Sequence, residues 1–176
     1  MPSPAPRPRR NRLRRTTAAA LVCAGMLAGS APAAGAGDWA WPLAPRPEVV
    51  GEWAPPAQRW APGHRGVDLG AAAGADVRSP AAGTVSFVGF VVDRPVLTVD
   101  HGGGLRSSFE PVESHLVRGD RVRRGQVVGV LRGRDHCGST GCLHWGVRRG
   151  EDYVNPLQFV GALEPSVLLP VPERLR

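Results

Sequence analysis

Four consecutive stretches decide the fold class of this chain: residues 83–92 (GTVSFVGFVV), 95–100 (PVLTVD), 101–104 (HGGG) and 105–109 (LRSSF). The first two are rich in β-branched and aromatic residues, which favour strands. The glycine run before residue 105 is typical of a tight turn that reverses the chain. This part of the sequence therefore predicts antiparallel hairpins.

A second strand–turn–strand pattern covers residues 117–122 and 126–131. Residues 74–78 (GADVR) and 119–123 (GDRVR) share Gly, Val and Arg at matching positions, and each precedes a strand, which suggests an internal duplication. The 176 residues include 23 glycines and 18 prolines, which argues against a helical bundle. We therefore expect an all-β fold, a small antiparallel β-sandwich or barrel with a duplicated hairpin motif.

Residues 1–36 are organised like a secretory signal peptide. Residues 1–15 carry six Arg and no acid, an apolar run of small residues covers 16–29, and Ala34-x-Ala36 offers a cleavage site. A disordered basic arm and a membrane anchor are the alternatives, but the apolar run is short and poor in Leu and Ile for an anchor. We expect export, cleavage after Ala36 and no stable membrane insertion.

The positive charge of the chain belongs to this leader. The formal net charge is +7, from 22 Arg, no Lys and 15 acidic residues. Removal of residues 1–36 leaves 16 basic against 15 acidic groups. A nearly neutral mature chain gives little support for nucleic-acid binding, so we expect no nucleic-acid partner.

Residues 37–62 are rich in proline and in tryptophan, which occurs as Trp39, Trp41, Trp53 and Trp60. Proline at this density blocks regular helix and central strand. We interpret the segment as an extended strap whose indoles lie against the domain, and a surface that binds sugars through the Trp faces is the alternative. Residues 63–161 would then form the domain, and residues 162–176 a C-terminal tail.

Cys137 and Cys142 are the cysteines that remain after cleavage. In an exported protein, two cysteines this close together most simply form a disulfide. Ligation of a metal ion by one thiolate is the alternative.

His64, Asp68 and His144 are the residues that suggest metal chemistry. His64 and Asp68 are four residues apart, and Gly66 between them permits a close turn. Cys142 and His144 are two residues apart, so on a strand they point to the same face. Two imidazoles and one carboxylate are the ligand type of a catalytic zinc, which keeps a fourth position for water. The plainer alternative is structural: Asp68 accepts a turn hydrogen bond and His144 is a partly buried imidazole.

The chain resembles the LytM/lysostaphin family of zinc metallopeptidases, which cut peptide bonds in bacterial cell walls. The resemblance runs from about residue 61 to residue 157. It rests on the order of these motifs: His64-x-x-x-Asp68, Gly83-Thr84-Val85, Asp100-His101-Gly102, Gly119-Asp120-x-Val122-x-x-Gly125-Gln126, Ser139-Thr140-Gly141-x-Leu143-His144 and Val154-Asn155-Pro156-Leu157. It implies a β-sandwich with a duplicated barrel-like motif and one zinc ion held by His64, Asp68 and His144.

Two departures from the family pattern affect the expected activity. The family usually carries His-x-His near the end and an aromatic-x-His pattern after the central hairpin, where this chain has Cys142-Leu143-His144 and Phe109-Glu110-Pro111. Both imidazoles that assist catalysis are therefore replaced. Because general acid–base assistance contributes about 10²–10⁴-fold, we expect a slow peptidase unless other groups substitute. The candidate catalytic substitutes are His136, which the disulfide loop would hold near the site, Glu110 and His115.

The sequence therefore predicts a secreted, cell-wall-associated zinc metalloendopeptidase acting on peptidoglycan peptides. The alternative is a weakly active or non-catalytic zinc-binding module that binds the cell wall or regulates wall hydrolases. A small β-domain without a metal, in which the His and Asp residues are structural, is a third possibility.

Overall fold

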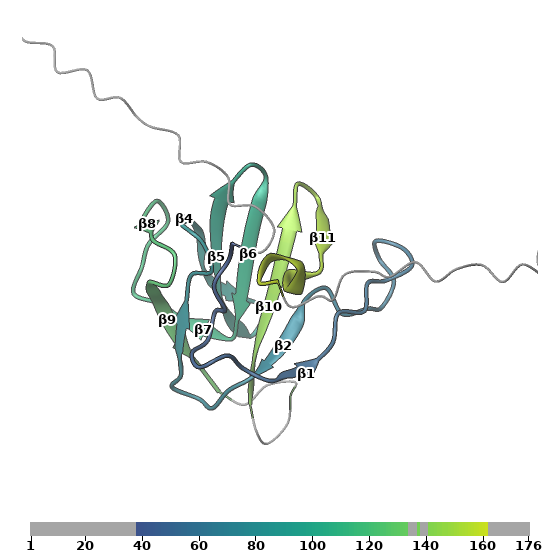
Figure 1. The fold of residues 1–176 in the computed structure, drawn as a ribbon, viewed down its shortest axis with the longest axis horizontal. Helices are drawn as coiled ribbons and strands as arrows, with labels where there is room; N and C mark the ends of the chain where they lie inside the picture. The colour runs from purple at the N-terminus through teal and green to yellow at the C-terminus, as the bar shows by residue number, and fades with distance from the viewer. Residues whose placement is uncertain (1–37, 134–136, 138–140, 162–176) are drawn as a thin grey trace, which may run out of the picture. The chain divides into compact units, whose positions relative to one another are not determined.

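The computed structural model describes residues 38–133, 137 and 141–161, and nearly all the regular elements in this part of the chain are antiparallel strands (Figure 1). The predicted leader, the predicted tail and His136 lie outside the described residues. The elements are β1 (Val49–Gly51), β2 (Val67–Gly70), β3 (Asp76–Arg78), β4 (Gly83–Val91), β5 (Arg94–Gly102), β6 (Leu105–Glu110), β7 (Val112–Glu113), β8 (Arg121–Val122), β9 (Val127–Leu131), β10 (Cys142–Arg149), β11 (Asp152–Val154) and the 3-10 helix η2 (Pro156–Phe159).

Two open sheets enclose one hydrophobic core. The larger sheet has the order β1-β2-β10-β6-β5-β4-β8, with β11 paired to β10, and the smaller one has the order β3-β9-β7. Side chains from both sheets join a single buried cluster, as Val77 and Leu131 of the small sheet and Leu97 of the large sheet illustrate. The all-β prediction is confirmed, and the sheets are open rather than closed into one barrel.

Strand alternation separates the core face of the large sheet from its outer face. In β6, Ser107 and Phe109 are fully buried, so Ser108 and Glu110 point the other way. In β2, Val67 and Leu69 belong to the core and place Asp68 on the outer face. This alternation assembles polar side chains on one side of the sheet.

The hairpins predicted over residues 83–109 are present, whereas the strand–turn–strand prediction over residues 117–131 is wrong in part. β4, β5 and β6 pair in sequence order, but residues 117–120 form a turn instead of a strand. The Asp120 carboxylate accepts a hydrogen bond from the Val117 amide at 2.9 Å, and the Asp120 amide donates to the Val117 carbonyl at 3.1 Å. The remaining strand, β8, pairs with β4 and not with β9. A local turn therefore overrides the β propensity of Val117.

The two sequence repeats occupy reciprocal positions. β3 lies in the first repeat and pairs with β9, the strand that follows the second repeat. β8 lies in the second repeat and pairs with β4, the strand that follows the first. The repeated valines, Val77 and Val122, are both buried. This exchange of partners is the arrangement expected of a duplicated unit.

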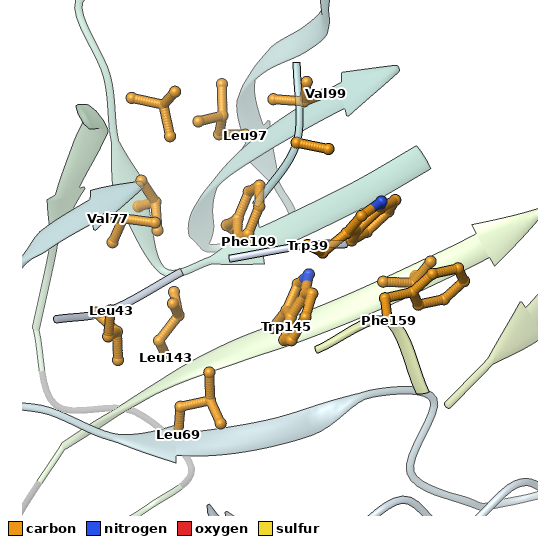
Figure 2. Close-up of a cluster of buried hydrophobic side chains, with 14 of the residues drawn as sticks. Trp39, Leu43, Leu69, Val77, Leu97, Val99, Phe109, Leu143, Trp145 and Phe159 are labelled. Atoms are coloured by element: carbon orange, nitrogen blue, oxygen red, sulfur yellow. The ribbon is translucent and has the colours of Figure 1, made fainter. Parts of the chain in front are cut away.

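The strap, residues 38–62, is joined to the domain at several points. Trp39 is only 3% exposed and stacks on Phe159 with ring centroids 4.4 Å apart, beside Trp145 (Figure 2). Further along, β1 pairs with β2. Trp60 differs, because its indole is 83% exposed in a turn between prolines. Among the described residues, no helix is long and apolar enough to cross a membrane.

Candidate metal centre

Two strands and one preceding loop bring the predicted ligands together. Asp68 of β2 and His144 of β10 are direct cross-strand neighbours. His64 lies just before β2, where it forms an isolated bridge with Ala54 of the strap through two backbone hydrogen bonds of 2.7 and 3.2 Å. Backbone pairing therefore holds each of the three predicted ligands in place.

The three side chains converge on one point. Nε2 of His64 lies 3.1 Å from Nδ1 of His144 and 3.2 Å from Oδ1 of Asp68, and that oxygen is 2.8 Å from His144 Nδ1. Metal bonds of about 2.0–2.2 Å in a tetrahedral site place ligand atoms roughly 3.3–3.5 Å apart. A small outward movement of these atoms would therefore admit a zinc ion, and the two-imidazole, one-carboxylate donor set suits that metal.

The strap determines which nitrogen of His64 faces the centre. The ring Nδ1 donates to the Glu52 carbonyl oxygen at 2.6 Å, because a carbonyl can only accept. In the neutral imidazole this hydrogen bond therefore leaves the lone pair on Nε2, which is directed at Asp68 and His144. A partner of this kind on the second ring nitrogen orients a metal-binding imidazole and raises its basicity.

Two glycines provide the close approaches that the ligands require. A Cβ on Gly51 of β1 would lie 2.5 Å from Oδ2 of Asp68, whose carboxylate is buried under that strand. A Cβ on Gly66 would lie 2.6 Å from Nε2 of His144. The sequence suggested that Gly66 permits a turn, but the structure gives a different reason: the imidazole of His144 packs directly against its backbone.

Glu110, one of the three candidate catalytic residues, lies beside the centre. It is the neighbour of His144 on β6, so the row Asp68, His144 and Glu110 crosses three adjacent strands on the outer face. Its side chain is 25% exposed, and its Oε1 lies 3.9 Å from Nη1 of Arg94. Of the other two candidates, His136 lies outside the described residues, and His115 does not line the groove that contains Glu110.

A groove of about 620 Å³ runs over this face of the sheet and contains two of the three ligands. His64, His144 and Glu110 line it together with the hydroxyl groups of Thr98 and Ser108, which are 3.2 Å apart. Its other lining residues are Gly63, Arg65, Phe87, Val91, Arg94, Val96, Gly146 and Tyr153. The groove is therefore lined by two predicted metal ligands, a carboxylate, two hydroxyl groups and apolar side chains.

The predicted disulfide between Cys137 and Cys142 is confirmed, with Cα atoms 5.8 Å apart. As Cys142 is bonded to another sulfur, it supplies no acid or base at the position where the family pattern has an imidazole. Pro111 likewise supplies none.

The remaining described histidines lie away from the metal centre. His101 donates from Nδ1 to the Ala82 carbonyl at 3.0 Å, and its Nε2 accepts from the Ser107 hydroxyl at 2.9 Å. Burial lowers the pKa of His101 below its ordinary value, although the Ala82 hydrogen bond and the charge of Asp100 act in the opposite direction. This imidazole therefore links β5 to the chain just before β4 and to β6. His115 is exposed and does not line the groove.

Fold and site together define a metallopeptidase-like module. The sequence profile of peptidase family M23 matches residues 62–156, and the chain belongs to this family. It is also 41% identical over 143 residues to uncharacterized proteins of Mycobacterium bovis and Mycobacterium tuberculosis, an alignment that covers 78% of this chain. The chain spans only 57% of the length of these relatives.

Solved structures share the fold. A candidate M23 peptidase from Pseudomonas aeruginosa is 28% identical with a TM-score of 0.52, and the alignment covers 72% of this chain and 55% of that one. A zinc-containing peptidase from Vibrio cholerae has a TM-score of 0.54 at 20% identity, over 65% of this chain and 37% of that one. The catalytic domain of the antimicrobial peptidase lysostaphin from Staphylococcus simulans has a TM-score of 0.55 at 18% identity, over 65% of this chain and 92% of that one.

Proposed function

We propose that this protein is an exported zinc metallopeptidase that hydrolyses peptides of peptidoglycan. The observation that carries the proposal is the convergence of His64 Nε2, Asp68 Oδ1 and His144 Nδ1 beside an open groove. Membership of family M23 supports peptide hydrolysis, and the leader-like residues 1–36 support export to the cell wall.

His64, Asp68 and His144 would hold the zinc ion. When bound, zinc lowers the pKa of a coordinated water to about 7 and polarises a carbonyl group. The Glu52 carbonyl keeps the proton of His64 on Nδ1, away from the centre. Asp68, only 7% exposed, is shielded from solvent that would compete for its carboxylate.

Glu110 is the residue that we propose as the proton acceptor and donor. Its carboxylate faces the same groove as His144 from the neighbouring strand. It would take a proton from the attacking water and pass it to the leaving amine, which is the role of a general base and then a general acid. Arg94, whose Nη1 lies 3.9 Å from Oε1 of Glu110, would hold this carboxylate in position.

The sheet floor would bind the substrate backbone. Thr98 and Ser108 hydroxyls point into the groove, where each can donate or accept a hydrogen bond with a peptide group. Phe87 and Val91, both partly exposed, offer an apolar wall for a side chain of the peptide. A groove of this mixed composition fits a short peptide with small side chains.

A zinc-binding module without turnover is the second candidate function. The observation that favours it is the loss of both assisting imidazoles, since Pro111 and the disulfide-bonded Cys142 occupy their positions. Such a module would keep the groove for wall binding or for regulating wall hydrolases.

Digestion of purified cell walls tests the proposal. We expect zinc-dependent release of new amino groups, loss of that release in Asp68→Ala, and a reduction of about 10²–10⁴-fold in Glu110→Gln with zinc still bound. His115→Ala, an exposed histidine away from the groove, is the matched control and should behave as the wild type. One bound zinc without any release supports the non-catalytic module, and failure to bind zinc overturns both functions.

A further inference from the structure

Asp68 belongs to a second set of potential metal ligands. The sulfurs of Cys137 and Cys142 and one carboxylate oxygen of Asp68 all lie within 4.8 Å of one another. The same carboxylate is shared with the set made by His64 and His144. While the two sulfurs are bonded to each other they offer no thiolate. Once separated, they would be soft ligands of the kind that zinc and cobalt bind readily.

The sheet keeps Cys142 beside Asp68 whether or not the disulfide is present. Cys142 is two residues before His144 on β10, and both residues pair with β2, opposite Gly70 and Asp68 respectively. Side chains two residues apart on a strand share a face. Cys142 is also fully buried, so the sulfur has little room to turn away.

The position of Cys137 is compatible with metal binding by both sulfurs. Zinc–sulfur bonds of about 2.3 Å place two sulfurs on a tetrahedral ion roughly 3.8 Å apart. The Cα atoms of the two cysteines are 5.8 Å apart, so rotation about the Cα–Cβ bond of the less buried Cys137 can provide that separation. The backbone does not need to move.

We propose that reduction of the Cys137–Cys142 disulfide creates a thiolate metal site made of both sulfurs and Asp68. With a phosphine as reductant, the phosphorus takes the oxygen of one water, its electron pair cleaves the sulfur–sulfur bond, and the two protons of that water go to the sulfurs. These protons are released when the sulfurs bind the ion. An ion held there occupies the carboxylate that His64 and His144 need, so the two sites exclude each other.

The consequence is redox control of the metal centre. In the oxidised protein the ion would bind Asp68 together with the two imidazoles. In the reduced protein it would bind Asp68 together with the two sulfurs. The binding step is independent of the proposed function, whereas the loss of hydrolysis in the reduced state rests on it.

Cobalt(II) provides a direct readout of the new site. We expect the oxidised protein to bind one Co²⁺ without a sulfur-to-cobalt charge-transfer band in the near ultraviolet. After treatment with the phosphine and its removal, the protein should show two more thiols than before, still bind one Co²⁺, and develop that band. The reduced His64→Ala variant should still show the charge-transfer band, because His64 is not part of the thiolate site; this holds even if the peptidase proposal fails. The reduced Asp68→Asn variant should show a weaker band. A fully reduced protein without the band, or with two ions bound at once, would overturn the proposal.

The double variant Cys137→Ser/Cys142→Ser distinguishes metal binding by the sulfurs from the effect of losing the covalent cross-link. It lacks both the covalent bond and the sulfurs, so we expect it to keep zinc and wall hydrolysis in the presence of the reductant while the wild type loses hydrolysis. Tryptophan fluorescence, to which the buried Trp39 and Trp145 contribute, checks that both proteins remain folded. If the reduced wild type and the double variant lose zinc to the same extent, the disulfide acts as a brace and the proposal is wrong.

Discussion

Gly51→Ala is predicted to weaken zinc binding, although residue 51 is not a ligand. The added Cβ would lie 2.5 Å from Oδ2 of Asp68 and 2.9 Å from its Cβ and Cγ atoms. These separations are well inside van der Waals contact, so the carboxylate or strand β1 has to move. Since Asp68 is 7% exposed and pairs with His144 on its other side, it has little freedom to do so without leaving the centre.

The expected magnitude follows from two effects. Overpacking at a buried site costs about 1–3 kcal/mol of folding stability. Loss of support for a metal ligand typically lowers metal affinity by about 10–100-fold, which corresponds to roughly 1.4–2.7 kcal/mol. Zinc affinity is measured by competition with a chromophoric chelator, and the stability of the zinc-free protein is measured by urea unfolding.

Gly70→Ala is the matched control. Gly70 lies on the same strand as Asp68, and a Cβ there would meet only the Val50 Cγ1 at 3.3 Å and the Glu48 carbonyl oxygen at 3.7 Å. Val50 is half exposed and can shift. Unchanged zinc affinity in Gly51→Ala, or an equal loss in both variants, would refute the argument that β1 positions the carboxylate.

Three further predictions concern stability. Val92→Gly should stabilise the protein by about 1 kcal/mol in urea unfolding, because Val92 has φ 60° in the β4–β5 turn and is 96% exposed; destabilisation would contradict this. Trp39→Ala should lower the free energy of unfolding by about 3–5 kcal/mol, because this indole is buried. Trp60→Ala should change it by no more than about 0.5 kcal/mol, because that indole is exposed. Equal losses in the two variants would show that the strap does not pack on the domain in solution. The lowered pKa of His101 means that below its ordinary value of 6.5 the unfolded chain binds a proton that the folded chain does not. The free energy of unfolding should therefore fall with decreasing pH by up to about 1.4 kcal/mol per unit until the folded pKa is reached, and His101→Gln should lose this component.

The strands and the convergence of His64, Asp68 and His144 could be predicted because the signals lie in residue types. β-branched residues and a glycine turn predict the pairing of β4, β5 and β6. His64, Asp68 and His144 are recognisable by their chemistry and by the family resemblance. The failure at Val117 has a local cause, since the Asp120 side chain closes a turn over residues of high β propensity.

The contribution of the strap could not be predicted in the same way. The Glu52 group that orients His64 is a backbone carbonyl, which any residue would supply. The amino-acid type at position 52 therefore does not indicate this contact. The requirement for glycine at position 51 arises only when β1 lies on β2. A long-range pairing of three residues has almost no signature in composition or periodicity.

The contact between Trp39 and Phe159 has a consequence for the order of assembly. The Trp39 amide donates to the Phe159 carbonyl at 3.0 Å, so the two ends of the described domain are fastened to each other. During synthesis the tryptophan emerges first, but its docking site is completed last, by β10 and η2. His144 also belongs to this late portion. A nascent or truncated polypeptide that stops before β10 can therefore neither bury the Trp39 indole nor bring its predicted metal ligands together, so the proposed hydrolytic activity would require the complete domain.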